Sequence, residues 1–403
     1  MNSKRRAWSV MLAAFLAGVA VALNQAKVPP VMHILIERLD VDLAVGGWLM
    51  SSFAVAGVVL GIPAAFALRL VGPKGAGLVA LGCTALGSAI GALANGPAVL
   101  LAGRVVEGIG LGLITVVAPA IISLWFSPAE RGMPMGIWAS WAPLGGFLMF
   151  NLAGPLLGAF GWQGVWWFGA SFALAAFGLY AVIVRAPPPA QGPAEQSFAP
   201  GGWAGRPLLN PASWMLALMF GTFSFATAGF STWAPSYLMQ AHGLDLPAAS
   251  FRVSLMSLGV IPSTIIAGRV LDRVRSRHLV LTLAILAEGA LMPWSFRLGF
   301  AGLVAPYMLL FGLVVGFIPT ALFTLAPESM PRTEHAGLAL GILSVGQNVG
   351  MLLGPPVVAA TIAQRNWGAG VLPLALSVAI GLAASLWLQF GQADRRPVAG
   401  AAR

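Results

Sequence analysis

Long apolar stretches, separated by short polar or charged segments, make up almost the whole chain. About twelve such stretches can be distinguished, each bounded by glycine, proline or charged residues. Because about 20 residues of helix cross the hydrocarbon core of a bilayer, each stretch predicts one membrane-spanning helix. The expected helix centres are Gly18, Val55, Leu86, Leu113, Phe147, Ala175, Phe223, Pro262, Ala287, Leu313, Val349 and Gly381.

One long polar interruption divides these stretches into two equal sets. It covers residues 187–211, is rich in proline and glycine, and is typical of a flexible linker. We therefore expect an all-α membrane protein with about twelve transmembrane helices in two six-helix bundles. The predicted parts are an N-terminal bundle at 1–186, a cytoplasmic linker at 187–211, and a C-terminal bundle with a short cytoplasmic tail at 212–403.

Composition and charge agree with a membrane protein and exclude two other classes. The 403 residues are 58% hydrophobic and only 8% charged, whereas a soluble domain carries about 25% charged residues. The net charge of +10 does not indicate nucleic-acid binding, because Lys and Arg lie in short loops and form no basic face or arm. Their distribution over alternate loops predicts a multi-pass protein of the inner (plasma) membrane, with both termini in the cytoplasm.

The two halves of the chain resemble each other. A basic segment at residues 268–277 lies between two apolar stretches, and a weaker copy occupies residues 67–74. Three further residues recur after 200 positions, each in the fifth predicted helix of its half: Gly146 and Gly346, Gly154 and Gly354, and Pro155 and Pro355. Such a duplication in a helical membrane protein is typical of a secondary transporter.

Four polar residues in predicted spans are candidates for a transport site. An ionisable group at mid-membrane costs about 3 kcal/mol or more. Arg104 and Glu107 share a helix face, so we predict an ion pair that a proton or a substrate anion breaks, or else a static pair that fixes packing. Asn24 and Lys27 also share a face and suit a small anion. Alternatively, Lys27 reaches water at the outer boundary of the membrane, where Pro29 and Pro30 end the helix.

Other polar or amphipathic side chains lie within predicted spans and are further substrate-binding candidates: Trp138, Trp141, Asn151, Gln347 and Asn348. Tryptophans also anchor helices at the membrane interface, and a buried amide can bind a neighbouring helix instead of a ligand. Both alternatives remain open for these residues. For Glu288, in the ninth predicted helix, we expect packing in a protonated form before a role as a proton site.

At this point the chain resembles the major facilitator superfamily, whose signature loop joins helices 2 and 3. The second half matches this signature through Gly268, Asp272, Arg273 and Arg277. The first half keeps Gly72 and Lys74 but has Arg69 in place of the signature aspartate and Ala65 in place of the glycine. The resemblance implies a gating role on the cytoplasmic side for Arg69, Lys74, Asp272, Arg273 and Arg277.

Two further motifs carry the same resemblance. Residues 101–112 are similar to the helix 4 pattern of the family, with Glu107 at the usual glutamine position, and residues 126–132 are similar to the loop that follows it. The resemblance implies alternating access around a cavity lined by helices 1, 4, 7 and 10, and proton coupling through Arg104. The missing first aspartate and the sequence from Trp233 to Leu238 look most like cyanate and nitroimidazole permease-like proteins, near nitrate, oxalate and monocarboxylate porters.

We therefore expect a secondary active transporter, coupled to a proton or counter-ion, for a small anion or a small polar organic solute. It would act as a monomer without cofactor or metal, with Glu107 carrying the coupling proton. No phosphate-binding loop or pattern of catalytic residues indicates an enzyme. The alternatives are a drug or metabolite efflux porter of the same fold, a non-transporting membrane sensor and, remotely, an intramembrane enzyme.

Overall fold

The structure is a computed structural model that describes residues 3–61, 63–127, 130, 132–185, 206–330 and 335–393. Within these residues it is helical and contains no strand. The first half forms α1 Ser3–Gln25, α2 Val28–Leu39, α3 Leu43–Leu60, α4 Ala64–Ala92, α5 Pro97–Trp125, α6 Gly132–Ala139 and α7 Trp141–Ile183. The second half forms α8 Pro211–His242, α9 Leu246–Arg273, α10 Arg277–Leu291, α11 Val304–Val315, α12 Phe317–Glu328, α13 Ala336–Gln364 and α14 Val371–Ala393. Short 3₁₀ turns lie at 206–209, 292–294, 301–303 and 367–370.

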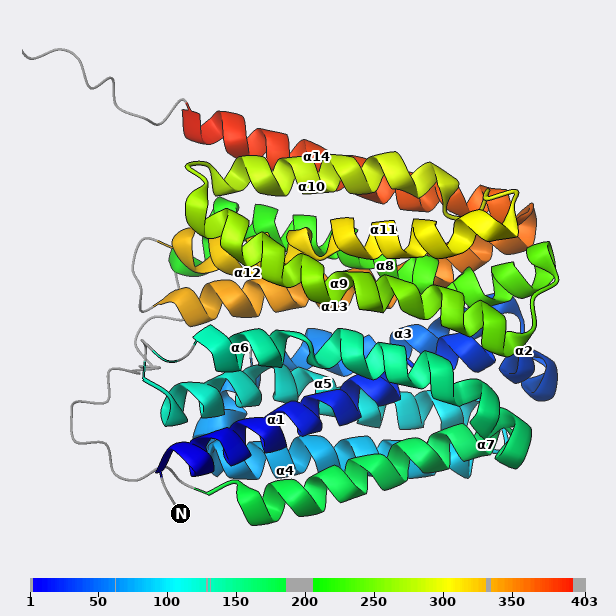
Figure 1. Ribbon diagram of the computed structural model, residues 1–403, viewed down its shortest axis with the longest axis horizontal. Coiled ribbons are helices and arrows are strands. Elements are labelled where there is room, and N and C mark those ends of the chain that lie inside the picture. The colour runs from blue at the N-terminus through cyan, green and yellow to red at the C-terminus, as the bar shows by residue number, and fades with distance from the viewer. Residues whose placement is uncertain are drawn as a thin grey trace, which may run out of the picture.

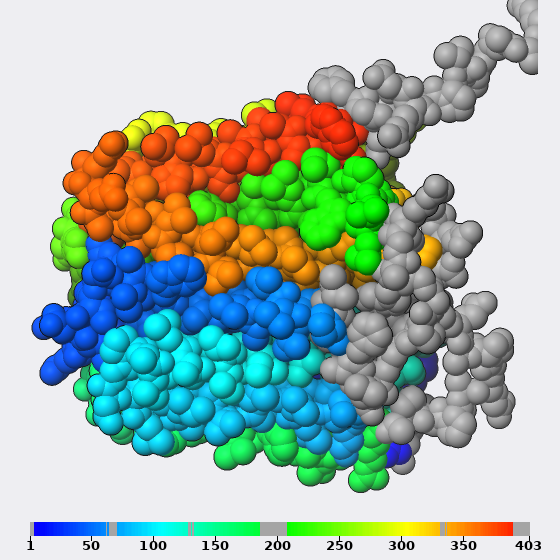
Figure 2. All heavy atoms as spheres, turned by 180° about the vertical axis from the view of Figure 1, so that it is seen from behind, coloured from blue at the N-terminus to red at the C-terminus, as the bar shows by residue number. Residues whose placement is uncertain are grey.

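The helices form two groups that lie side by side along their length, α1–α7 and α8–α14, as Figure 1 shows and the view from behind in Figure 2 repeats. The start of α1 and the end of α14 lie at the same end of the molecule, here called the terminal end. The opposite end, here called the distal end, holds α2 and the bend in α7. The all-helical class predicted from the apolar pattern is therefore confirmed.

By length and composition, ten helical stretches of the described residues can cross a membrane, against the twelve expected. One of them, Met133–Ile183, turns back on itself at Gly161 and so contains two antiparallel arms. Gly161 has φ 68°, a left-handed conformation that glycine adopts without strain. The helix α10, which matches another of the predicted spans, is not among the ten because it is only 15 residues long. All twelve expected centres lie in helices.

Corresponding helices of the two halves begin and pack in the same way, which supports a duplication. Asp42 caps the start of α3 by accepting a hydrogen bond from the Val45 amide, and Asp245 caps α9 through the Ala248 amide. Gly108 of α5 lies against the carbonyl of Phe53 in α3, so closely that a β-carbon would overlap it. Gly312 of α11 lies in the same way against Met256 of α9. Residues 107 and 311 therefore occupy matching places.

Helix α13 packs closely against α8 through a ridge of glycines. Gly346, Gly350 and Gly354 recur every fourth residue, and each lies directly against a main-chain carbonyl of α8. Small residues at this spacing allow two helix backbones to approach closely in a membrane, where lipid offers no hydrophobic force between helices. The opposite face of α13 packs along α3 of the other bundle, where Gly57 faces Asn348.

The two bundles join most fully toward the distal end. There, buried residues of α2 such as Met32 belong to the same apolar cluster as Trp233 and Tyr237 of α8. The terminal half of the N-terminal bundle has a separate cluster, around Val10, Ile114 and other residues of that bundle alone. The predicted linker lies almost wholly outside the described residues, and its boundaries at 187–211 stay a prediction.

Candidate transport site

The candidate site begins at an interruption in the first apolar stretch. Residues 4–39 form one apolar helical stretch of 36 residues, yet the helix breaks at Ala26 and Lys27. The cause is local, because Pro29 and Pro30 have no amide N–H and cannot donate to the carbonyls of Gln25 and Ala26. The prolines therefore end α1 at Gln25, as expected from the sequence, and they also begin α2, at positions where proline is tolerated.

Arg104 of α5 satisfies the carbonyls near this break. Its Nη2 donates to the carbonyl of Gln25 at 3.2 Å and its Nη1 to that of Asn24 at 2.7 Å. Its Nε donates to the carbonyl of Leu49 in α3 at 3.1 Å, and the guanidinium lies over the Phe53 ring, 4.5 Å from its centroid. Arg104 therefore joins the end of α1 and the helix α3 to its own helix, α5. Its planar guanidinium has several N–H donors, so it can bind all of these carbonyls at once.

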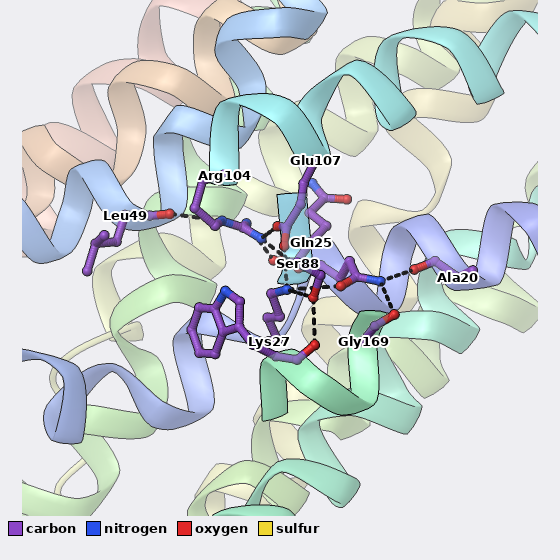
Figure 3. A network of polar contacts seen from close by, with 10 residues as sticks. Ala20, Gln25, Lys27, Leu49, Ser88, Arg104, Glu107 and Gly169 are labelled. Atoms are coloured by element: carbon purple, nitrogen blue, oxygen red, sulfur yellow. Dashed lines mark hydrogen bonds and ion pairs between the residues drawn. The ribbon is translucent and has the colours of Figure 1, made fainter. Parts of the chain in front are cut away.

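Glu107 links Arg104 to Lys27 (Figure 3). Its Oε2 accepts from Arg104 Nη1 at 2.5 Å, as the three-residue spacing predicts, and its Oε1 accepts from Lys27 Nζ at 2.5 Å. All three side chains have no exposed surface. With Glu107 ionised, this charged triad carries one net positive charge inside the N-terminal bundle, and with Glu107 protonated it carries two.

Lys27 uses all three of its N–H donors. Besides Glu107, it donates to Asn24 Oδ1 at 2.9 Å and to Ser88 Oγ of α4 at 2.7 Å, and it lies 4.8 Å from the centre of the Trp166 ring. The alternative that Lys27 reaches water is wrong, because its exposed fraction is 0%. In this conformation Lys27 has no free donor for a substrate.

Asn24 completes the network by joining α1 to the second arm of α7. Its Nδ2 donates to the carbonyls of Ala20 and Gly169, at 2.9 and 3.1 Å. Ser88 and Trp166 lie in ordinary apolar stretches and were not predicted as site residues. Ser88 in turn donates to the Trp166 carbonyl at 2.7 Å. The network therefore ties together α1, α3, α4, α5 and α7 in the distal half of one bundle.

The remaining substrate candidates lie in other places. Trp138 and Trp141 stack on each other with ring centres 5.3 Å apart, and Trp138 packs against Gly18 of α1. Asn151 bridges the two bundles, because its Nδ2 donates to Ser254 Oγ of α9 at 3.1 Å.

On α13, the two amide candidates differ in exposure. Asn348 is buried and donates to the Ser344 carbonyl of its own helix, while its Oδ1 has no hydrogen-bond partner among the described residues. Gln347 is partly exposed. Neither belongs to the network around Glu107.

The predicted gating residues lie at the terminal end, far along the helices from the charged triad. Lys74, Asp272 and Arg273 are exposed, and Arg69 lies within α4. Arg277 forms an ion pair with Glu328 at the end of α12 and donates from Nε to the Leu271 carbonyl. This pair ties α10 to α12 within the C-terminal bundle.

Glu288 is buried in the C-terminal bundle, with 1% of its surface exposed. Its Oε1 has no hydrogen-bond partner in the part of the chain that the structure describes. It lies on α10, which packs against α14 and α11. Glu288 therefore lies in the other bundle from the charged triad.

The fold and these motifs can now be compared with known proteins. The sequence matches the Major Facilitator Superfamily over residues 10–355. The chain belongs to this superfamily. It is 24% identical to the Hexuronate transporter of Bacillus subtilis over 386 residues, which are 92% of each chain. It is 26% identical to the Probable sulfoacetate transporter SauU of Cupriavidus necator, covering 87% of this chain and 86% of that one.

Other similar proteins differ in their named function or are known as solved structures. The chain is 24% identical to the Multidrug resistance protein Stp of Mycobacterium tuberculosis, covering 83% of this chain and 72% of that protein. Among solved structures, a bacterial homologue of the human lysosomal transporter Spinster, in an inward-facing and occupied conformation, matches with a TM-score of 0.72 at 16% identity, over 95% of this chain and 96% of that chain. The chain is thus a multi-pass membrane transporter of the major facilitator type.

Proposed function

We propose that the protein is a proton-coupled symporter of a small organic anion, with Glu107 as the proton carrier. One observation carries the proposal: Glu107 is the only acid within a buried network of two cations at the break between α1 and α2. Protonation of Glu107 would remove its attraction for Lys27 and Arg104 and leave two positive charges close together in a bundle with low dielectric constant. An arriving substrate anion then replaces the negative charge that Glu107 loses when it is protonated.

The relatives named above support the substrate class, since a hexuronate and sulfoacetate are small organic anions. The low content of charged residues, 8% of the chain, also favours a small anion, because a multivalent one needs more cations. Lys27 and Arg104 attract the anion electrostatically in this proposal. We place direct contact with the substrate among the partly exposed residues between the bundles, including Trp141, Asn151 and Gln347.

Alternating access accounts for the way the bundles are joined. The bias of Lys and Arg toward the terminal end supports a cytoplasmic position for that end. The apolar cluster shared by both bundles at the distal end then closes the protein on the outer side. In this proposal the bundles rock about the site between them, and Arg69, Lys74, Asp272, Arg273 and Arg277 control closure on the cytoplasmic side.

Uptake by proteoliposomes tests the proposal. The purified protein is reconstituted and offered radiolabelled glucuronate, sulfoacetate or nicotinate, with the outside more acidic than the lumen. We expect at least one anion to accumulate, and accumulation to stop when a protonophore collapses the pH gradient. If none of the three enters faster than into protein-free liposomes, or if entry ignores the gradient, the proposal is wrong.

The second candidate function is efflux of a planar hydrophobic compound. The stacked pair of Trp138 and Trp141 favours it, because aromatic faces bind planar ligands. The same proteoliposomes distinguish the two functions. An exporter would move an aromatic dye such as ethidium in the direction opposite to the flow of protons. It would accumulate none of the three anions.

A further inference from the structure

We propose that Gln25, not Lys27, is the side chain of α1 that contacts the substrate and sets its affinity. The inference rests on the proposed function and identifies a specificity-determining residue for it. The sequence predicts Lys27 as the anion-binding residue, because it is a cation in an apolar stretch. The structure shows that its donors are all engaged and that the side chain is fully buried.

Gln25 differs from the rest of the network in exposure. Asn24, Lys27, Arg104 and Glu107 have 0% of their surface exposed, whereas Gln25 is partly exposed. Its side chain also faces the other bundle, because Nε2 lies 3.9 Å from the sulfur of Met351 in α13. Gln25 is therefore the residue through which the buried network reaches a partly exposed position beside the other bundle.

The amide of Gln25 is weakly engaged. A thioether is a poor acceptor, so the contact with Met351 satisfies one amide N–H only weakly. This is the only hydrogen bond that the Gln25 side chain makes with the described residues. The amide can therefore donate to a carboxylate or sulfonate oxygen, and its carbonyl can accept from a substrate hydroxyl. An organic acid that carries hydroxyl groups fits both properties.

The main chain of Gln25 connects this contact to the charged triad. Arg104 donates to the Gln25 carbonyl, and Arg104 also binds Glu107. Any movement of Arg104 when Glu107 gains its proton is therefore transmitted directly to Gln25. Because this bond uses the backbone, substitutions of the side chain leave it in place. The contact with substrate can be removed without removing the network.

Two variants separate a substrate contact from a packing role. Gln25→Met has about the same volume and keeps an apolar contact with Met351, but has no N–H donor. Gln25→Glu has the same shape but repels an anion. Gln163→Met is the matched control, because Gln163 is an exposed glutamine that lines an open groove between the arms of α7 at the distal end.

The experiment measures KM and kcat for uptake of the anion that the wild type accumulates, together with the thermal shift that this anion produces. A hydrogen bond to a charged group contributes about 1.5–3 kcal/mol. We therefore expect Gln25→Met to raise KM about tenfold or more, with kcat within about threefold of wild type. Its melting temperature without ligand should be unchanged, and the ligand-induced shift should be lost. Gln25→Glu should abolish uptake at low anion concentration, and Gln163→Met should behave as wild type.

A KM within twofold of wild type for Gln25→Met would overturn the proposal, as would an equal increase in Gln163→Met. If Gln25→Met loses thermal stability without ligand and Gln25→Glu transports normally, Gln25 has a packing role and the inference also fails. Failure of the proposed function is distinguishable, because in that case the wild type itself accumulates none of the anions.

Discussion

At matching places the N-terminal bundle buries Glu107 and the C-terminal bundle buries Phe311. Each residue precedes a glycine that lies against a main-chain carbonyl of a neighbouring helix: Gly108 against α3, and Gly312 against α9. Around Glu107 lie two cations, and the main-chain carbonyls of residues 24 and 25 at the end of α1 also belong to this network. Around Phe311 there is an aromatic cluster instead, with the Phe230 ring 5.5 Å away.

The difference indicates that the two bundles have different roles after duplication. A buried charge triad is costly to form and sensitive to the loss of one charge, so it can respond to a proton. Phe311 and the glycine ridge themselves carry no titrating group and hold one arrangement. We therefore assign proton coupling to the N-terminal bundle and a rigid framework to the C-terminal bundle. The following substitutions test that assignment.

Arg104→Ala should have the largest effect. It removes the donors to three main-chain carbonyls and leaves Glu107 paired with Lys27 alone. Breaking a buried ion pair costs about 3–5 kcal/mol, so the melting temperature should fall while membrane insertion is retained. Uptake in proteoliposomes should be abolished. Uptake at the wild-type rate would contradict the role of the triad.

Gly350→Ala should damage the C-terminal bundle by a steric mechanism. The new β-carbon would overlap the Gly221 carbonyl of α8, and overpacking of this kind costs about 1–3 kcal/mol. Gly178→Ala is the control, because nothing lies within 4 Å of a β-carbon at that position. Thermal unfolding followed by tryptophan fluorescence should show a loss of stability in the first variant only. Equal melting temperatures would mean that the glycine ridge is not needed.

Phe311→Leu should lower stability without changing the pH dependence of uptake. Loss of ring contacts in a buried aromatic cluster costs about 1–2 kcal/mol, but no charge changes. The equivalent substitution Glu107→Gln should have the opposite pattern, with a pH profile that becomes flat. Rates measured between pH 5 and 8 distinguish the two positions, and a flat profile for Phe311→Leu would remove the proposed division of roles.

Lys4→Gln should have the smallest effect. Lys4 pairs with Glu130 at 3.4 Å at the terminal end, where both side chains are largely exposed, 83% and 56%. Exposed ion pairs contribute about 0–1 kcal/mol because water and salt screen them. Stability and uptake should both stay at wild-type values. A loss comparable to that of Arg104→Ala would show that burial does not explain the importance of the triad.

Much of the fold follows from the sequence, because apolar length and bounding charges identify membrane helices one at a time. The pairing of Arg104 with Glu107 was predictable from their spacing on one helix. The environment of Lys27 was not, because it depends on Ser88 and Trp166, which are distant in sequence. The two prolines predicted the end of the first helix, and α1 does end at Gln25. The second helix, α2, which continues the apolar stretch to Leu39, was not predicted. Gln25 was missed because the neighbouring cation was the more obvious candidate.

In the proposed function, Glu107 carries the proton that accompanies the anion. The most direct test is to measure proton entry with a pH-sensitive dye inside proteoliposomes while the anion enters, for the wild type and for Glu107→Gln. We expect the wild type to acidify the lumen in a fixed ratio to anion uptake. Glu107→Gln should move the anion down its gradient without acidification. The same proton-to-anion ratio in Glu107→Gln as in the wild type would contradict the account.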